Sequence, residues 1–180
     1  MFAYPLGDDA ALRLLEERHA EALYALIAAN RAHLREWLPW VDNEQSPDTT
    51  RAFLRTALQQ HADNRGGQYG IWERGQLAGV IGQHPIDWAN RSGSLGYWLG
   101  AAYQGRGLMT RACRALVTYA FREQGLHRVE VRAALGNARS RAIPERLGFR
   151  QEGFLRDAEW LYDHYVDLVV YGMLADEWRE

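Results

Sequence analysis

One stretch of the sequence has the composition of an anion-binding loop at the start of a helix. Its glycines can turn neighbouring backbone N–H groups toward one point, and the positive end of the following helix favours a phosphate group. The arginine between the glycines would suit a diphosphate. An ordinary turn explains the same residues, so the stretch alone leaves both interpretations open. It consists of Gln104, Gly105, Arg106, Gly107, Leu108, Met109 and Thr110.

The glycine spacing of this loop comes close to the fingerprint of dinucleotide-binding folds. That fingerprint has a glycine or alanine at its third position, where this sequence has Thr110. The preceding chain also reads as consecutive strands, and not as the start of a βαβ unit. We therefore do not expect a Rossmann-type site.

A second polar element follows further along the chain. Asn137 stands where a strand ends, and Ser140 stands one turn into the next predicted helix. Both side chains can face the same groove. A helix start with two local caps would also account for them.

The hydrophobic pattern predicts the elements that position these residues. In the first half it indicates a strand at 11–16, a helix from Glu17 to about Trp37 and a second helix that begins at Ser46-Pro47. Two strands at 68–73 and 76–83 flank Arg74-Gly75, which is a plausible tight hairpin turn. A third strand is expected around 94–100.

The second half carries the clearest helix, at 107–122, whose apolar pairs repeat every four residues and include Cys113. A strand at 129–133, a short helix at 138–147 and two final strands follow. Val166, Leu168 and Val170 share one face of the last strand. We predict an α+β fold with a mixed, largely antiparallel central sheet flanked by helices.

Composition limits the function classes. The 180 residues suit one domain, 1–180, and the formal net charge of −2 argues against a dedicated nucleic-acid binder. No apolar stretch is long enough to span a membrane, and the N-terminus does not read as a signal peptide. The cysteine and histidine spacings match no metal site. We therefore expect a cytoplasmic protein without a metal.

The loop and the second polar element together resemble the GCN5-related N-acetyltransferase (GNAT) superfamily. Its acetyl-CoA motif, Q/R-x-x-G-x-G/A, follows a central strand, and an Asn-x-x-Ser/Ala element and a Lys/Arg-Leu-Gly-Phe ending come later. Two positions depart from the common pattern: Met109 replaces a small residue, and Pro144 stands where many members carry a tyrosine acid. The matching residues are Gln104, Gly107, Asn137, Ser140, Arg146, Leu147, Gly148 and Phe149.

Both departures are typical of the ribosomal-protein N-terminal acetyltransferases of the RimJ/RimL type. The segments 30–42, 107–110 and 152–159 also resemble that branch. The resemblance implies acetyl-CoA as co-substrate and a protein N-terminus as acceptor. An acetyltransferase of a small amine (a polyamine, aminoglycoside or amino-acid derivative) and a non-catalytic acetyl-CoA sensor remain alternatives. A homodimer is compatible with the sequence.

The resemblance also implies roles for single residues. The pantetheine arm is expected along Tyr97, Trp98 and Leu99, with the Leu99 N–H polarising the thioester carbonyl. Asn137 would bind the same arm, and the 104–110 loop would bind the diphosphate. Glu159 is the expected general base and Ser140 the expected acid. A solvated Glu159 and a Ser140 that only contacts CoA are the simpler alternatives.

The charge pattern offers a further hint about both ligands. Three arginines near the loop, Arg106, Arg111 and Arg114, are expected to attract the phosphates of CoA. An acidic group in the late segment is expected where a cationic amine would enter. Its members are Asp157, Glu159, Asp163 and Asp167.

Overall fold

The fold is built on one eight-stranded sheet with the strand order β1-β2-β3-β4-β5-β6-β8-β7. The computed structural model describes residues 3–7 and 9–179. Within these residues, only β5 and β6 pair in parallel; the other neighbouring strands are antiparallel. The strands are β1 (Ala3–Pro5), β2 (Ala10–Leu14), β3 (Gly67–Glu73), β4 (Gln76–Gln83), β5 (Ser92–Leu99), β6 (Arg128–Ala134), β7 (Arg150–Leu161) and β8 (His164–Leu174).

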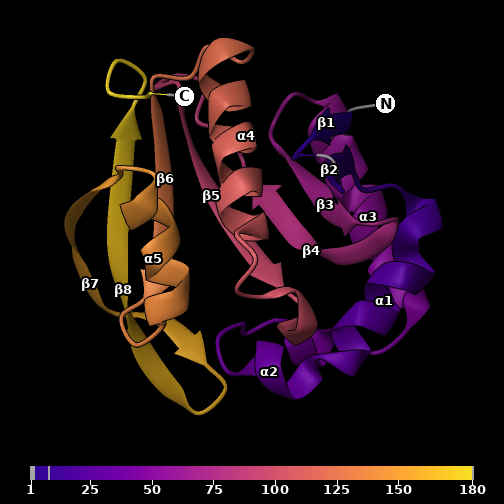
Figure 1. Cartoon of the computed structure of the whole chain (residues 1–180). Helices are drawn as coiled ribbons and strands as arrows, with labels where there is room; N and C mark the ends of the chain where they lie inside the picture. The colour runs from indigo at the N-terminus through magenta and orange to yellow at the C-terminus, as the bar shows by residue number, and fades with distance from the viewer. Residues whose placement is uncertain (1–2, 8, 180) are drawn as a thin grey trace.

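Helices cover both faces of this sheet (Figure 1). On one face α4 crosses the centre and α5 lies over β6 and β8, while α1 and α3 pack against β3 and β4. Within the described ranges, no helix is long and apolar enough to cross a membrane. The helices are α1 (Ala20–Ala29), α2 (Arg31–Arg35), α3 (Pro47–Ala62), α4 (Leu108–Arg122) and α5 (Ala138–Arg146), with short 3₁₀ turns at Glu17–His19, Val41–Asn43 and Ala101–Tyr103.

Two hydrophobic cores follow from the alternation of side chains along the strands. On β4, Ile81 packs in the core under α4, whereas its neighbour Val80 packs in the core with α1 and α3. The apolar stripe of α4 is buried as predicted, and Cys113 is fully buried within it. The predicted α+β class with a largely antiparallel sheet is confirmed.

The predicted start of the second helix and the predicted hairpin turn are both confirmed. The Ser46 hydroxyl accepts a hydrogen bond from the Thr49 N–H, and Pro47 is the first residue of α3. Arg74 and Gly75 both have positive φ angles, 50° and 79°, as a tight hairpin turn requires.

The single helix predicted from Glu17 to Trp37 is wrong. The chain there forms a 3₁₀ turn, α1 and α2, with the break at Asn30. The Asn30 carboxamide donates to the Leu26 carbonyl and accepts from the Ala101 N–H. This second bond reaches the end of β5, so a contact distant in sequence accompanies the break. The short strand β1 was not predicted either.

Candidate active site

The 104–110 loop forms the N-terminal end of α4 and leaves space beside its glycines. Gly105 and Gly107 have φ angles of 76° and 71°, and Gly107 is the cap of α4. Other residues adopt this left-handed conformation only at a cost. A Cβ added at either glycine would meet nothing within 4 Å. The free backbone N–H groups of the first helical turn therefore border open space, which suits an anionic ligand.

The loop arginine bonds to other groups of the protein. Arg106 Nη1 donates to Glu73 Oε2 at 2.7 Å, and the Glu73 side chain is almost fully buried. Arg111 donates to the carbonyl of Leu6 at 2.6 Å, and Arg114 lies over an indole ring near the C-terminus. The three arginines thus contact separate partners. We therefore expect an anion at this loop to bind the helix end and the backbone N–H groups.

The sheet opens beside this loop, because β5 and β6 separate. Their pairing ends at Leu95 and Val131, although β5 continues to Leu99. The Gly100 N–H donates to Ala78 and thereby shows that even-numbered residues here direct their backbone groups toward β4. The backbone groups of Tyr97 and Leu99 consequently point the other way, into the gap.

The opposite side of the gap is also lined by backbone. The Leu135 N–H donates to the Asp167 carbonyl, so odd-numbered residues of β6 direct their backbone groups toward β8. Arg132 and Ala134 then direct theirs toward β5, beyond the point where pairing has ended. A ligand with amide groups could therefore bind in this gap as an additional strand does.

The beginning of α5 lies across the gap from β5. Asn137 caps this helix, since its Oδ1 accepts a hydrogen bond from the Ser140 N–H at 3.1 Å. The Tyr97 hydroxyl donates to the Ser140 carbonyl at 3.0 Å, and burial raises the pKa of this phenol well above its usual range. Among the described contacts, the Ser140 hydroxyl has no hydrogen-bond partner. It is free to contact a ligand.

The Gln104 side chain connects the loop to α5 and to α2. Its Oε1 accepts from Arg139 Nη1 at 2.8 Å, and its Nε2 lies 2.9 Å from His33 Nε2. Because Arg139 fixes the orientation of the amide, His33 must be the acceptor in the second bond. Arg139, His33 and Glu73 were missed by sequence reasoning, since no local spacing relates them to the loop.

Three further predicted residues take different positions. The Trp98 ring packs on the α1–α3 side, 6.1 Å from the Trp40 ring, and its backbone groups face β4. Leu108 and Met109 are buried in the core under α4, with 1% and 5% of their surface exposed. They can offer only their N–H groups to a ligand, and Thr110 is half-buried beside them.

Glu159 lies on the opposite face of the sheet from α4 and α5. It pairs with Val166, which shares its face with Leu168, whereas the alternate residues Val169 and Tyr171 pack toward α5. Its carboxylate is half-buried and has no hydrogen-bond or ionic partner among the described residues. Burial raises its pKa above the usual 4.5, which makes it a better proton acceptor.

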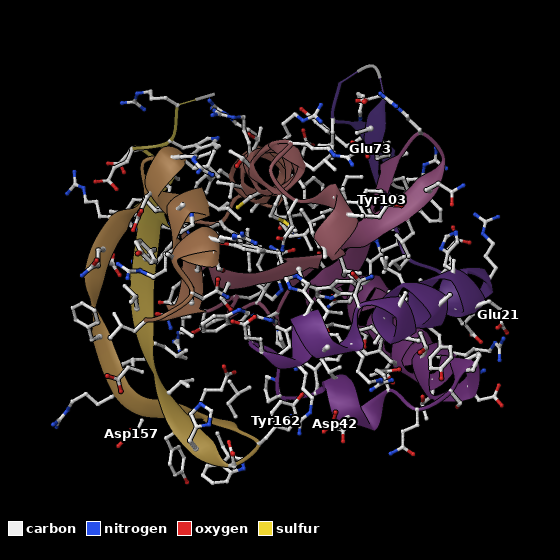
Figure 2. The ribbon with its side chains drawn as sticks, turned by 60° about the horizontal axis from the view of Figure 1, so that its bottom comes forward. Glu21, Asp42, Glu73, Tyr103, Asp157 and Tyr162 are labelled. Carbon is white, nitrogen blue, oxygen red and sulfur yellow. The ribbon has the colours of Figure 1, made fainter. Side chains whose placement is uncertain are left out.

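The turn between β7 and β8 is fastened to the segment after α2. The Tyr162 hydroxyl donates to the Leu38 carbonyl at 2.6 Å, and Arg35 lies 3.8 Å from the centre of the Tyr162 ring. Arg35 also bonds to Asp42 at 3.0 Å. Figure 2 shows Tyr162 beside Asp42, with Asp157 further along the hairpin. These contacts fix the strand end that carries Glu159.

The segment 30–42 also contacts the region where α5 begins. A Cβ added at Gly136 would lie 3.4 Å from Trp37 Cη2, so this indole packs against the turn between β6 and α5. No group of three or more His, Cys, Asp or Glu side chains that could hold a metal occurs in residues 3–7 and 9–179. The arrangement therefore offers an anion-binding helix end, a backbone-lined gap, a free hydroxyl and a raised-pKa carboxylate.

Comparison with known proteins links this geometry to a family. Residues 10–150 match the acetyltransferase (GNAT) domain. YdaF of Bacillus subtilis (strain 168) is 41% identical over 99% of this chain and 98% of its own length. The ribosomal-protein-serine acetyltransferase of Escherichia coli (strain K12) is 30% identical, covering 95% of this chain and 96% of that enzyme.

A solved structure of a ribosomal-protein acetyltransferase has the same fold as this chain. RimL, a ribosomal L7/L12 alpha-N-protein acetyltransferase in complex with coenzyme A, has a TM-score of 0.94 and 29% identity, over 98% of this chain and 99% of RimL. The predicted fold, co-substrate and RimJ/RimL resemblance are thereby confirmed. The chain belongs to the GNAT acetyltransferase family, as an acetyl-CoA-dependent N-acetyltransferase of the RimJ/RimL type.

Proposed function

We propose that this enzyme acetylates the N-terminal α-amino group of a protein, and that a ribosomal protein is its acceptor. The observation that carries the proposal is the gap between β5 and β6, which lies between the anion-binding loop and the face that holds Glu159. The names of the E. coli relative and of RimL support the acceptor class. We place the enzyme in the cytoplasm, where ribosomal proteins are made.

In this proposal the CoA diphosphate binds the backbone N–H groups of the 104–110 loop. The pantetheine arm then enters the gap beside Tyr97, with Asn137 on its other side. The thioester carbonyl reaches the Leu99 N–H. A donor aimed at the developing oxyanion typically contributes about 3 kcal/mol to transition-state stabilisation.

The acceptor amine approaches from the Glu159 face. Its nitrogen attacks the thioester carbon, a C–N bond forms and the C–S bond breaks. The amine proton passes to Glu159, and the departing thiolate takes a proton from the Ser140 hydroxyl. The proton on Glu159 then returns to Ser140 through solvent, which restores both groups and leaves CoA as the free thiol. An α-amino group with a pKa of about 8 is roughly one-tenth neutral at pH 7, whereas a lysine with a pKa of about 10.4 is far less so. This difference favours an N-terminal acceptor.

A CoA-release assay against several amine classes tests the proposal. The panel contains peptides with the N-termini of ribosomal proteins, the same peptides with blocked N-termini, polyamines and aminoglycosides. We expect turnover on the free peptides and none on the blocked ones. Turnover on small amines alone would contradict the acceptor class. Tight acetyl-CoA binding with no turnover on any amine would identify a sensor and contradict the enzymatic role.

A further inference from the structure

The loop arginine is held by an acidic residue that no cofactor motif includes. Glu73 ends β3, and its carboxylate is only 8% exposed. Arg106, in the middle of the loop, donates to Glu73 Oε2 from Nη1 at 2.7 Å. Among the described residues, the Glu73 side chain makes no other hydrogen bond or ion pair. A buried carboxylate without a partner is strongly unfavourable, so the pair constrains both of its members.

Arg106 carries this constraint into the loop backbone. Its Nη2 donates to the Ala102 carbonyl at 2.7 Å, and its guanidinium carbon lies 5.8 Å from the centre of the Tyr103 ring. The side chain therefore ties the loop both to its own beginning and to β3. Figure 2 shows Glu73 and Tyr103 at the same end of the molecule.

The loop needs such an anchor because of its glycines. Gly105 and Gly107 stand on either side of Arg106, and glycine has more accessible conformations than any other residue. An unanchored loop would populate the binding conformation only part of the time. The apparent affinity of a ligand falls in proportion to that populated fraction.

We propose that Glu73 is a positioning residue for the cofactor: through Arg106 it fixes the loop whose backbone N–H groups bind the CoA diphosphate. The inference rests on the proposed placement of the diphosphate at this loop. It assigns Arg106 a structural role in place of direct phosphate binding. A different role for Glu73 predicts the opposite change in CoA affinity. If Glu73 only neutralised the charge of Arg106, it would weaken CoA binding, and replacing Glu73 would strengthen that binding.

The experiment measures CoA affinity by calorimetry for Glu73→Gln, Arg106→Gln and the double variant. We expect each single variant to weaken CoA binding about tenfold, as a loop competent about one-tenth of the time would. The double variant should be no weaker than either single variant, because both changes remove one shared anchor. In turnover assays the KM for acetyl-CoA should rise about tenfold, while kcat at saturating acetyl-CoA stays near its original value.

A matched control comes from another ion pair of the same length. Arg150 Nη2 lies 2.7 Å from Glu177 Oε1, near the C-terminus and far from the loop in sequence. Glu177→Gln should leave CoA affinity unchanged. A general loss of stability would lower the melting temperature without raising KM at an unchanged kcat. Arg106→Lys, which keeps the positive charge, should retain more CoA affinity than Arg106→Gln.

CoA affinity at or above the original level in folded Glu73→Gln would overturn the inference. Where a single variant does not fold, the double variant decides by the same criterion, because it leaves no buried charge unpaired. The Gly107→Ala variant separates this outcome from a failure of the proposed placement. If Gly107→Ala weakens CoA binding and the Glu73 variants do not, only the positioning role is wrong. If Gly107→Ala also binds normally, the diphosphate lies elsewhere.

Discussion

A single methyl group at Gly107 should separate loop conformation from ligand contact. Gly107 has a φ angle of 71°, where an alanine costs about 1–2 kcal/mol because its Cβ approaches the following carbonyl oxygen. Beyond its own residue and its chain neighbours, the added Cβ would meet no atom within 4 Å in the free protein. Gly107→Ala therefore carries a conformational cost with no clash, and it places a methyl group in the space beside the end of α4.

Gly125 offers a control with nearly identical local geometry. Its φ angle is 67°, a Cβ there would also meet nothing within 4 Å, and it follows the opposite end of α4. Gly125→Ala should therefore lose the same stability. For a chain of this size, about 1–2 kcal/mol corresponds to a fall of about 2–8 °C in melting temperature. Thermal unfolding followed by circular dichroism should give similar shifts for both variants.

Calorimetric titration with CoA should then distinguish the two. The methyl group of Gly107→Ala would hinder one or two charge-assisted hydrogen bonds from the loop to the diphosphate, each contributing about 1.5–3 kcal/mol. Since each 1.4 kcal/mol is about tenfold in affinity, we expect CoA binding to weaken at least about tenfold. Gly125→Ala should bind CoA like the unchanged protein.

Equal CoA affinity for the two alanine variants would refute this reasoning. It would mean that the space beside Gly107 is not where the diphosphate lies. A melting temperature for Gly107→Ala far below that of Gly125→Ala would contradict a different step, namely that the conformational cost is the same at both ends of α4.

Three other substitutions test the remaining parts of the site. Glu159→Gln should lower kcat/KM by about 10²–10⁴-fold. The pKa of Glu159 is raised in the folded state, so the stability that this carboxyl contributes is present at low pH and is lost as pH rises above 4.5. The melting temperature of Glu159→Gln at pH 7 should therefore stay level or rise. A lower melting temperature there would contradict the sign. Tyr97→Phe removes the bond to the Ser140 carbonyl and should cost about 1 kcal/mol of unfolding free energy and raise the KM for acetyl-CoA; unchanged values in both would show that the bond is unimportant. Tyr162→Phe removes the bond to Leu38 and should raise the KM for the acceptor peptide with CoA affinity unchanged, as steady-state kinetics and calorimetry can check.

The loop and α4 could be predicted because their determinants are local. The apolar stripe of α4 repeats at helical spacing, and the flanking glycines at 107 and 125 adopt the positive φ angles that punctuate a helix. Glu159 and Ser140 were identified by resemblance to a family. Their spacing alone did not distinguish them from a solvated charge and a helix cap.

The elements that were missed depend on contacts between distant parts of the chain. Asn30 separates α1 from α2 and bonds to the Ala101 N–H, which the N-terminal sequence cannot reveal. The sequence predicted Arg106 as a phosphate ligand because it stands between two glycines. In the structure its partner is a buried carboxylate on β3. The bridge from His33 through Gln104 to Arg139 likewise joins three elements.

The two faces of the sheet explain why the gap matters for the chemistry. The loop at the start of α4 and the cap of α5 lie on one face, whereas the alternation along β8 places Glu159 on the other. A continuous sheet would keep a ligand bound to the first face apart from a base on the second. Because the β5–β6 pairing ends at Leu95 and Val131, the Leu99 N–H faces the gap between the two strands. In the proposed mechanism the acyl carrier and the amine meet at this gap, so we expect catalysis to depend on the unpaired end of β5.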